Sequence, residues 1–205
     1  MSAQYGNCSY WDERYKKEEE AFDWYQGYAN LKAILSQYLT KSDNIMMAGA
    51  GNSRLSEDMY NDGYTTIANT DISSVVIAQM TEKYRDKPTM TWEQMNVCAL
   101  EYPEGSFEAI IDKGTADAIL CGEGSTKNAT AMFEEASRVL KPDGVYIMIS
   151  YGLPEARLNY LENESYGWTV TVHTVPKGVG DAKEGDPDSF HYIYCCKKGE
   201  TSATQ

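Results

Sequence analysis

Two glycines and an aspartate have the types and the spacing needed to hold the sugar of a nucleoside. Gly49 and Gly51 directly follow residues 44–48, an apolar segment that we expect to form a strand. Glycine permits a tight turn at that point and lets the backbone approach a ligand closely. Asp71 follows the next such segment, 66–70, and lies 20 positions after Gly51 (51 to 71). In a strand–helix–strand unit this spacing lets a carboxylate accept hydrogen bonds from ribose hydroxyls, although an aspartate that merely caps the next helix fits the same pattern.

Asn96 ends a third apolar segment, 90–95, in the same way. A side-chain amide there can accept a hydrogen bond from the amino group of adenine or donate one to a ring nitrogen. An asparagine that only stabilises a turn is the alternative, and both interpretations stay open.

A fourth segment, 107–112, ends in a run of polar residues. Asp112, Lys113 and Thr115 lie at or directly after its end, and ligands bind at this carboxyl edge in parallel sheets. Asp112 and Asp117 are the nearest carboxylates that could orient an incoming nucleophile. An exposed ion pair of Lys113 is the alternative, and such a pair contributes about 0–1 kcal/mol.

Other kinds of catalytic site lack their residues. The two histidines, His173 and His191, both lie in the C-terminal part, and the sequence has no Gly-x-Ser-x-Gly motif. Position 54 is Arg54 rather than the third glycine of a Gly-x-Gly-x-x-Gly motif, and the five cysteines form no Cys-x-x-Cys pair. Hydrolytic triads, zinc sites and dinucleotide binding are therefore poor explanations, and we expect no bound metal.

The elements that must position these residues alternate between strands and helices. We expect helices at 53–60, 73–84 and 128–140, because apolar residues recur there at helical spacing. A turn at 141–144 then precedes a fifth strand at 145–150. This alternation predicts a parallel sheet with right-handed crossovers.

The C-terminal part has a different pattern. Residues 168–175 alternate between two faces, and residues 190–196 form a second extended, aromatic-rich run. Two such runs predict an antiparallel hairpin at the edge of the sheet. Five alternating units followed by this hairpin predict an α/β, Rossmann-like sheet of seven strands, the arrangement of class I methyltransferases.

The N-terminal part shows no strand pattern. Leu31, Ile34, Leu35 and Tyr38 form an apolar stripe at helical spacing, and the preceding residues 10–25 are aromatic and acidic. We expect a helical cover that either packs its aromatic residues on the core or binds a ligand. The predicted organisation is a single domain over residues 1–205, with the cover at 1–40, the core at 41–198 and a frayed tail at 199–205.

Composition excludes several partners. The formal net charge is −13, with 18 Lys and Arg against 31 Asp and Glu. Such a surface repels nucleic acid and anionic lipid, whereas it can attract a basic protein or simply keep the chain soluble. The sequence has no apolar run of about 20 residues and no signal-peptide pattern at its start, so we expect a cytoplasmic protein with no membrane contact.

Several motifs occur together and resemble one family. They are Tyr-Trp-Asp-Glu-Arg-Tyr at 10–15, Asp-Trp-Tyr at 23–25, the glycine loop at 49–53, Asp-x-Ser-Ser-Val-Val at 71–76, Asp-Lys-Gly-Thr-x-Asp-Ala at 112–118 and Ser-Arg-Val-Leu-Lys-Pro-x-Gly at 137–144. The set is similar to the lysine methyltransferases that modify translation elongation factor 1-alpha, and to their relative that acts on citrate synthase. The resemblance runs from about residue 10 to residue 198.

This resemblance implies S-adenosylmethionine as the cofactor and ten residues that contact it. They are Trp11, Tyr15 and Trp24 as closing aromatic residues, Gly49 and Gly51 as the glycine loop, Asp71 with Ile72 at the ribose, Asn96 with Val97 at the adenine, and Lys113 after the fourth strand. The sequence departs from the family in two places, because the family usually has aspartate at the position of Asn96 and Gly-Cys-Gly where residues 48–51 read Ala-Gly-Ala-Gly.

The resemblance also implies a reaction. A lysine must lose its proton before it can accept a methyl group, and its ordinary pKa is about 10.4. The site must therefore desolvate the amine or offer a proton acceptor, for which Asp112 and the backbone near Thr115 are our candidates. We expect a protein-lysine methyltransferase that acts on elongation factor 1-alpha or a similar protein, as a monomer or weak oligomer. A small-molecule methyltransferase and a non-catalytic subunit of an assembly are the alternatives.

Overall fold

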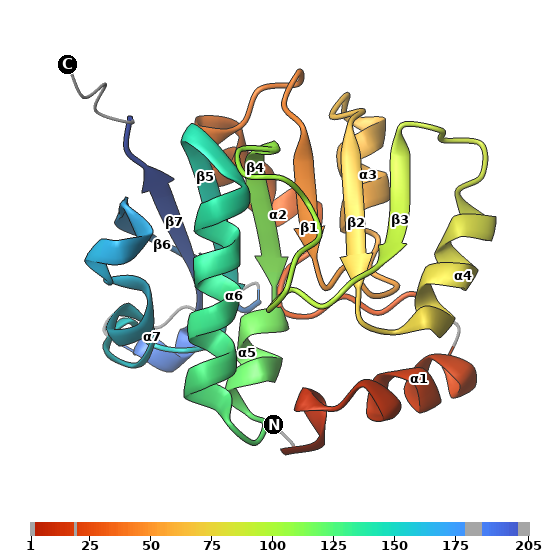
Figure 1. The fold of residues 1–205 in the computed structure, drawn as a ribbon, viewed down its shortest axis with the longest axis horizontal. Helices are drawn as coiled ribbons and strands as arrows, with labels where there is room; N and C mark the ends of the chain where they lie inside the picture. Colours follow the sequence, from red (N-terminus) through yellow and green to blue (C-terminus); the bar gives the residue numbers. More distant parts are fainter. Residues whose placement is uncertain (1–2, 19, 179–185, 201–205) are drawn as a thin grey trace.

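The computed structural model describes residues 3–18, 20–178 and 186–200, and within them one twisted sheet of seven strands forms the centre (Figure 1). The strand order is β3-β2-β1-β4-β5-β7-β6. The strands are β1 (Ile45–Ala48), β2 (Ile67–Asp71), β3 (Met90–Gln94), β4 (Phe107–Lys113), β5 (Leu140–Ser150), β6 (Trp168–Pro176) and β7 (Phe190–Lys198). The strands β1 to β5 pair in parallel, and β7 runs antiparallel to both β5 and β6. This confirms the predicted fold class.

Helices cover both faces of the sheet. Those in the described residues are α1 (Cys8–Lys17), α2 (Tyr28–Tyr38), α3 (Leu55–Asn61), α4 (Ser74–Lys83), α5 (Thr115–Leu120), α6 (Ser125–Val139) and α7 (Pro154–Leu161). The apolar residues of α2, α3 and α4 pack in one cluster with Ile45 and Met47 of β1. Those of α5, α6 and α7 pack in a second cluster with Met46 and Ala48. Successive side chains of β1 therefore pack into the two clusters on opposite faces of the sheet, which is why this strand is apolar throughout.

Helix α1 lies on neither face of the sheet, although its Tyr15 is buried in the first cluster. In Figure 1 it lies below the sheet, across the carboxyl ends of the parallel strands. It contacts α4 and the short 3-10 helix at Ala3–Gly6. The N-terminal helical cover is thus divided in two, with α1 at the edge where ligands bind and α2 against a face of the sheet.

The structure adds elements that the sequence pattern did not reveal. Helix α5 follows β4 immediately, and α7 begins at Pro154. Strand β5 begins at Leu140 rather than at residue 145, and the predicted turn at 141–144 interrupts its pairing, since Phe107 pairs with Leu140 and Ala109 with Val145. Residues 201–205 of the predicted frayed tail and residues 179–185 lie outside the described residues.

We predict that α2 is part of the same cooperative core as the sheet. Leu31 on α2 is fully buried against that core. Leu31→Ala should therefore lower the free energy of unfolding by about 2–5 kcal/mol, because it leaves a cavity that can collapse only in part. Urea unfolding measures this. The exposed Ser36→Ala on the same helix is the control, expected within about 0.5 kcal/mol of wild type; equal values for the two variants would contradict the prediction.

Candidate functional site at the carboxyl edge of the sheet

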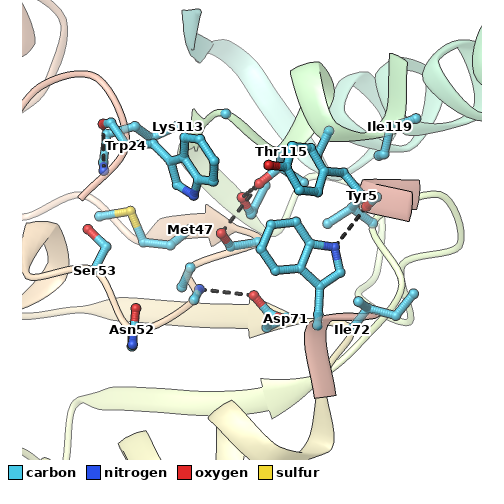
Figure 2. Close-up of a pocket in the computed structure, with 18 of the residues that line it drawn as sticks. Tyr5, Trp24, Met47, Asn52, Ser53, Asp71, Ile72, Lys113, Thr115 and Ile119 are labelled. Atoms are coloured by element: carbon cyan, nitrogen blue, oxygen red, sulfur yellow. Dashed lines mark hydrogen bonds between the residues drawn. The ribbon is translucent and has the colours of Figure 1, made fainter. Parts of the chain in front are cut away.

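One cavity of about 220 Å³ lies between α1 and the carboxyl ends of β1, β2 and β4 (Figure 2). Its wall contains every one of the ten residues named above as cofactor contacts, together with Thr115. These residues come from six separate parts of the chain, so the fold is what brings them together. Asp112 and Asp117 are not in the wall.

The turn after β1 is built so that only glycine fits. Gly49 and Gly51 have φ angles of +66° and +54°, which other residues rarely adopt. A Cβ on Gly49 would lie 2.7 Å from Thr115 Cγ2, and one on Gly51 would lie 2.7 Å from the Tyr15 hydroxyl. Thr115 is held there because its hydroxyl donates to the carbonyl of Ala48 at 2.7 Å. At its two glycines the turn therefore presents backbone without a side chain to the cavity.

Asp71 links this turn to the end of β2. One carboxylate oxygen accepts a hydrogen bond from the Gly51 N–H at 2.9 Å, and the other accepts one from the Ser73 N–H at 2.9 Å. The residue is only 6% exposed. Burial raises the pKa of Asp71 to about 6, against the effect of these backbone hydrogen bonds. Each oxygen has a second lone pair with which it can accept a hydroxyl.

Asn96 and Val97 line the cavity beyond β3. The Asn96 side chain accepts a hydrogen bond from the Cys98 N–H at 2.9 Å. This is the turn-stabilising contact that we considered as the alternative for this residue. Its side chain therefore belongs both to a turn and to the wall of the cavity.

Lys113 ties the N-terminal segment to β4. Its ammonium group donates to Asp23 at 2.9 Å and to the carbonyl of Trp24 at 3.0 Å. The side chain is 6% exposed. Burial lowers the pKa of Lys113, and the Asp23 carboxylate opposes this shift. The ion pair is therefore buried on its Lys113 side, in the cavity wall, and reaches the surface on its Asp23 side.

Aromatic residues close the cavity from the N-terminal side. The Trp11 indole donates to the carbonyl of Tyr5 at 2.8 Å and stacks on Tyr15 with ring centroids 6.0 Å apart. The Arg14 guanidinium lies 5.4 Å from the centre of the Trp24 ring. Figure 2 shows the Trp24 side chain on one side of the cavity and Tyr5 on the other. Tyr5 and Arg14 were not predicted, because only the folding back of this segment brings them to the site.

Asp112 lies behind the cavity and not in it. The carboxylate is fully buried and accepts hydrogen bonds from the N–H groups of Thr115 and Ala116 at 2.7 and 3.0 Å and from the Tyr146 hydroxyl at 2.8 Å. Burial raises the pKa of Asp112 to about 7, although these hydrogen bonds oppose the shift. This geometry favours a role as the cap that holds the start of α5, over the role of proton acceptor.

Two further features limit what the described residues can do. No group of three or more His, Cys, Asp or Glu side chains among them is arranged to hold a metal ion. None of the helices described is both long and apolar enough to span a membrane.

The chain is similar to known methyltransferases. Residues 46–148 match the family described as "Methyltransferase domain". EEF1A lysine methyltransferase 4 of Mus musculus is 34% identical over 212 aligned positions, which cover 98% of this chain and 80% of that protein. The human eEF1A lysine and N-terminal methyltransferase is 34% identical over 91% of this chain, which spans 27% of that protein.

Solved structures share the fold. A chain of the complex between the Haloferax volcanii Trm112 methyltransferase activator and the putative methyltransferase superposes with a TM-score of 0.69 at 12% identity, over 98% of this chain and 99% of that one. A SAM-dependent methyltransferase of Methanosarcina mazei gives 0.64 at 15% identity, over 88% of this chain and 100% of that one.

The cavity fits S-adenosylmethionine, the cofactor of this family. At Gly49 and Gly51 the turn has no room for a Cβ beside Thr115 and Tyr15, so its backbone borders the cavity there, and the Asp71 carboxylate keeps lone pairs that can accept hydroxyl groups. The fold, the site and a relative 34% identical over nearly the whole chain agree. The protein therefore belongs to the S-adenosylmethionine-dependent methyltransferases, in the family of the EEF1A lysine methyltransferases.

Proposed function

We propose that this protein methylates a lysine side chain of translation elongation factor 1-alpha. The observation that carries the proposal is the 34% identity to EEF1A lysine methyltransferase 4 along 98% of the chain, together with a cavity that contains all ten expected cofactor contacts. A net charge of −13 favours a basic protein as the partner. A substrate of the translation machinery would place the enzyme in the cytoplasm.

The proposed binding mode assigns each wall residue a task. Asp71 accepts hydrogen bonds from the ribose hydroxyls, and Asn96 with Val97 holds the adenine. Gly49 and Gly51 let the backbone approach the rest of the cofactor closely. The aromatic residues of the N-terminal segment exclude water, and Lys113 keeps that segment attached to β4.

The cofactor would supply a methyl group carried on a positively charged sulfur. A neutral amine bonds to the methyl carbon, and the electron pair of the broken carbon–sulfur bond stays on the sulfur. The protein must align and desolvate that amine. Aromatic walls lower the pKa of a lysine by desolvation, and the displaced proton can leave to solvent. Thr115 remains our candidate contact, because it lines the cavity and its hydroxyl oxygen can accept a hydrogen bond while its proton is donated to the carbonyl of Ala48.

The proposed reaction predicts a labelled lysine. Incubating the purified protein with eukaryotic cell lysate and methyl-labelled S-adenosylmethionine should label one protein band, and peptide mapping should find the label on a lysine of elongation factor 1-alpha. A label confined to small molecules would instead support the small-molecule alternative. Cofactor binding without any labelled product, or no binding, would support a non-catalytic subunit.

Cofactor affinity should depend on Asp71 and on pH. Asp71→Ala should weaken S-adenosylmethionine binding by about 10- to 100-fold, because hydrogen bonds to a charged group contribute about 1.5–3 kcal/mol. In the wild type the carboxylate protonates as the pH falls through about 6, so the affinity should drop below that pH. Calorimetry between pH 5 and 8 measures both effects. The exposed Asp86→Asn should bind like wild type; the same pH profile in Asp71→Ala as in wild type would contradict the assignment.

Replacing glycine by alanine should affect cofactor affinity differently at Gly49, in the turn after β1, and at Gly167, outside the cavity wall. Gly49→Ala and Gly167→Ala both place a side chain at a φ near +65°, so the backbone strain is the same. Only at Gly49 does the new Cβ meet other atoms within 4 Å. Gly49→Ala should therefore lose at least about tenfold in cofactor affinity beyond any loss in Gly167→Ala. Equal affinities in the two variants, measured by calorimetry and with unfolding free energies determined in parallel, would show that the contact does not matter.

A further inference from the structure

Asp117 is a buried carboxylate with no part in the cofactor cavity. It is fully buried in the first turn of α5, and it does not line the cavity. The Arg157 guanidinium of α7 donates two hydrogen bonds to it, at 3.0 and 2.8 Å, and the Ser150 hydroxyl donates a third at 2.7 Å. Its charge is therefore compensated by an equally buried partner. Such a pair costs desolvation energy, and a structure that keeps one usually gains a fixed geometry in return.

The same carboxylate fixes two aromatic residues from distant parts of the chain. The Tyr25 hydroxyl donates to one of its oxygens at 2.8 Å, and the backbone N–H of Tyr151 donates to the same oxygen at 3.2 Å. Tyr25 also has a φ of +65°, a conformation uncommon for a residue other than glycine. Non-glycine residues in such conformations persist where surrounding contacts hold them and gather at functional sites. The two rings lie with their centroids 6.1 Å apart.

These two rings connect the cavity to the surface. Tyr25 lines the cavity and packs on Gly114, where a Cβ would come within 3.3 Å of the tyrosine ring. Tyr151 does not line the cavity and is 41% exposed, in spite of its large apolar ring. It directly follows β5, so it lies at the same carboxyl edge of the sheet as the end of β4. The two rings are in contact and form one continuous surface, so a side chain that lies along it would arrive at the wall formed by Gly114 and Thr115.

We propose that Tyr25 and Tyr151, both positioned by Asp117, form one wall of the passage through which the target lysine reaches the methyl group of the cofactor. This inference rests on the proposed function. The rings offer apolar surface that suits the aliphatic stem of a lysine, and the Arg157 guanidinium, 5.3 Å from the centre of the Tyr151 ring, helps to hold that ring in place. When the lysine side chain leaves water and enters this passage, desolvation favours its neutral amine, the form that the reaction needs.

The two buried cations beside the passage are both paired with carboxylates. The Arg157 side chain is 9% exposed and already paired with Asp117. The ammonium group of Lys113 is paired with Asp23. Neither cation is therefore available to an incoming carboxylate or phosphate. Burial and the nearby Lys177 lower the pKa of His191, whose ring centroid lies 5.0 Å from that of Tyr25, and Asp117 opposes this shift.

The test compares substitutions at the exposed end of the passage. Tyr151→Ala removes the ring, Tyr151→Phe keeps it, and Tyr60→Ala removes another partly exposed tyrosine on α3, away from the cavity wall. For each, we would measure the dissociation constant of S-adenosylmethionine, the affinity for the lysine-bearing substrate in the presence of S-adenosylhomocysteine, and kcat/KM for its methylation. The substrate is the protein that the wild type labels in lysate.

We expect Tyr151→Ala to lose at least tenfold in kcat/KM and in substrate affinity, while its cofactor affinity stays within twofold of wild type. Tyr151→Phe and Tyr60→Ala should remain within threefold of wild type in all three measurements. The passage is wrong if Tyr151→Ala methylates like wild type, if Tyr151→Phe fails equally, or if cofactor affinity falls in parallel with activity. A wild type that binds cofactor but labels no lysine overturns the proposed function itself, and the passage falls with it.

Discussion

The hydrogen bond between the Gly51 N–H and the Asp71 carboxylate, at 2.9 Å, is the contact on which the site depends. It joins the turn after β1 to the end of β2, two points 20 residues apart in the chain. The turn can exist only because Gly49 and Gly51 adopt positive φ angles. With the turn closed in this way, its two glycines present bare backbone to the cavity, and the carboxylate keeps lone pairs for a ligand.

Around this contact, the structure fastens the N-terminal segment with a small number of polar anchors. Lys113 holds Asp23 and the backbone of Trp24, and Asp117 holds the hydroxyl of Tyr25. Three consecutive residues of one segment are thus attached to β4 and α5. This arrangement gives the aromatic cover a defined position over the cavity, although apolar contacts alone have little directional preference. The cofactor site and the proposed substrate passage both include residues of this segment, so the way the segment packs on the core affects both sites.

Much of this architecture follows from sequence pattern, and the exceptions have physical causes. The apolar runs that end at Ala48 and Asp71 predict both the parallel strands and the carboxyl-edge site. Helix α5 has only six residues, too few for a periodic pattern to be recognised. The position of Asp112 at a strand end is evident from the sequence, but the face of the sheet to which its side chain points is not. Because successive strand residues point to opposite faces, Lys113 lines the cavity while Asp112 points to Tyr146 and the start of α5. Tyr25 and Tyr151 meet only through the tertiary fold.

The most direct test of the account is a crystal structure of the protein with S-adenosylhomocysteine bound. The account predicts that both ribose hydroxyls lie within hydrogen-bond distance of the Asp71 carboxylate, with the adenine beside Val97 and the Gly49–Gly51 backbone against the rest of the ligand. A structure with the ligand bound elsewhere, or bound here with Asp71 bonded only to Gly51 and Ser73, would contradict it.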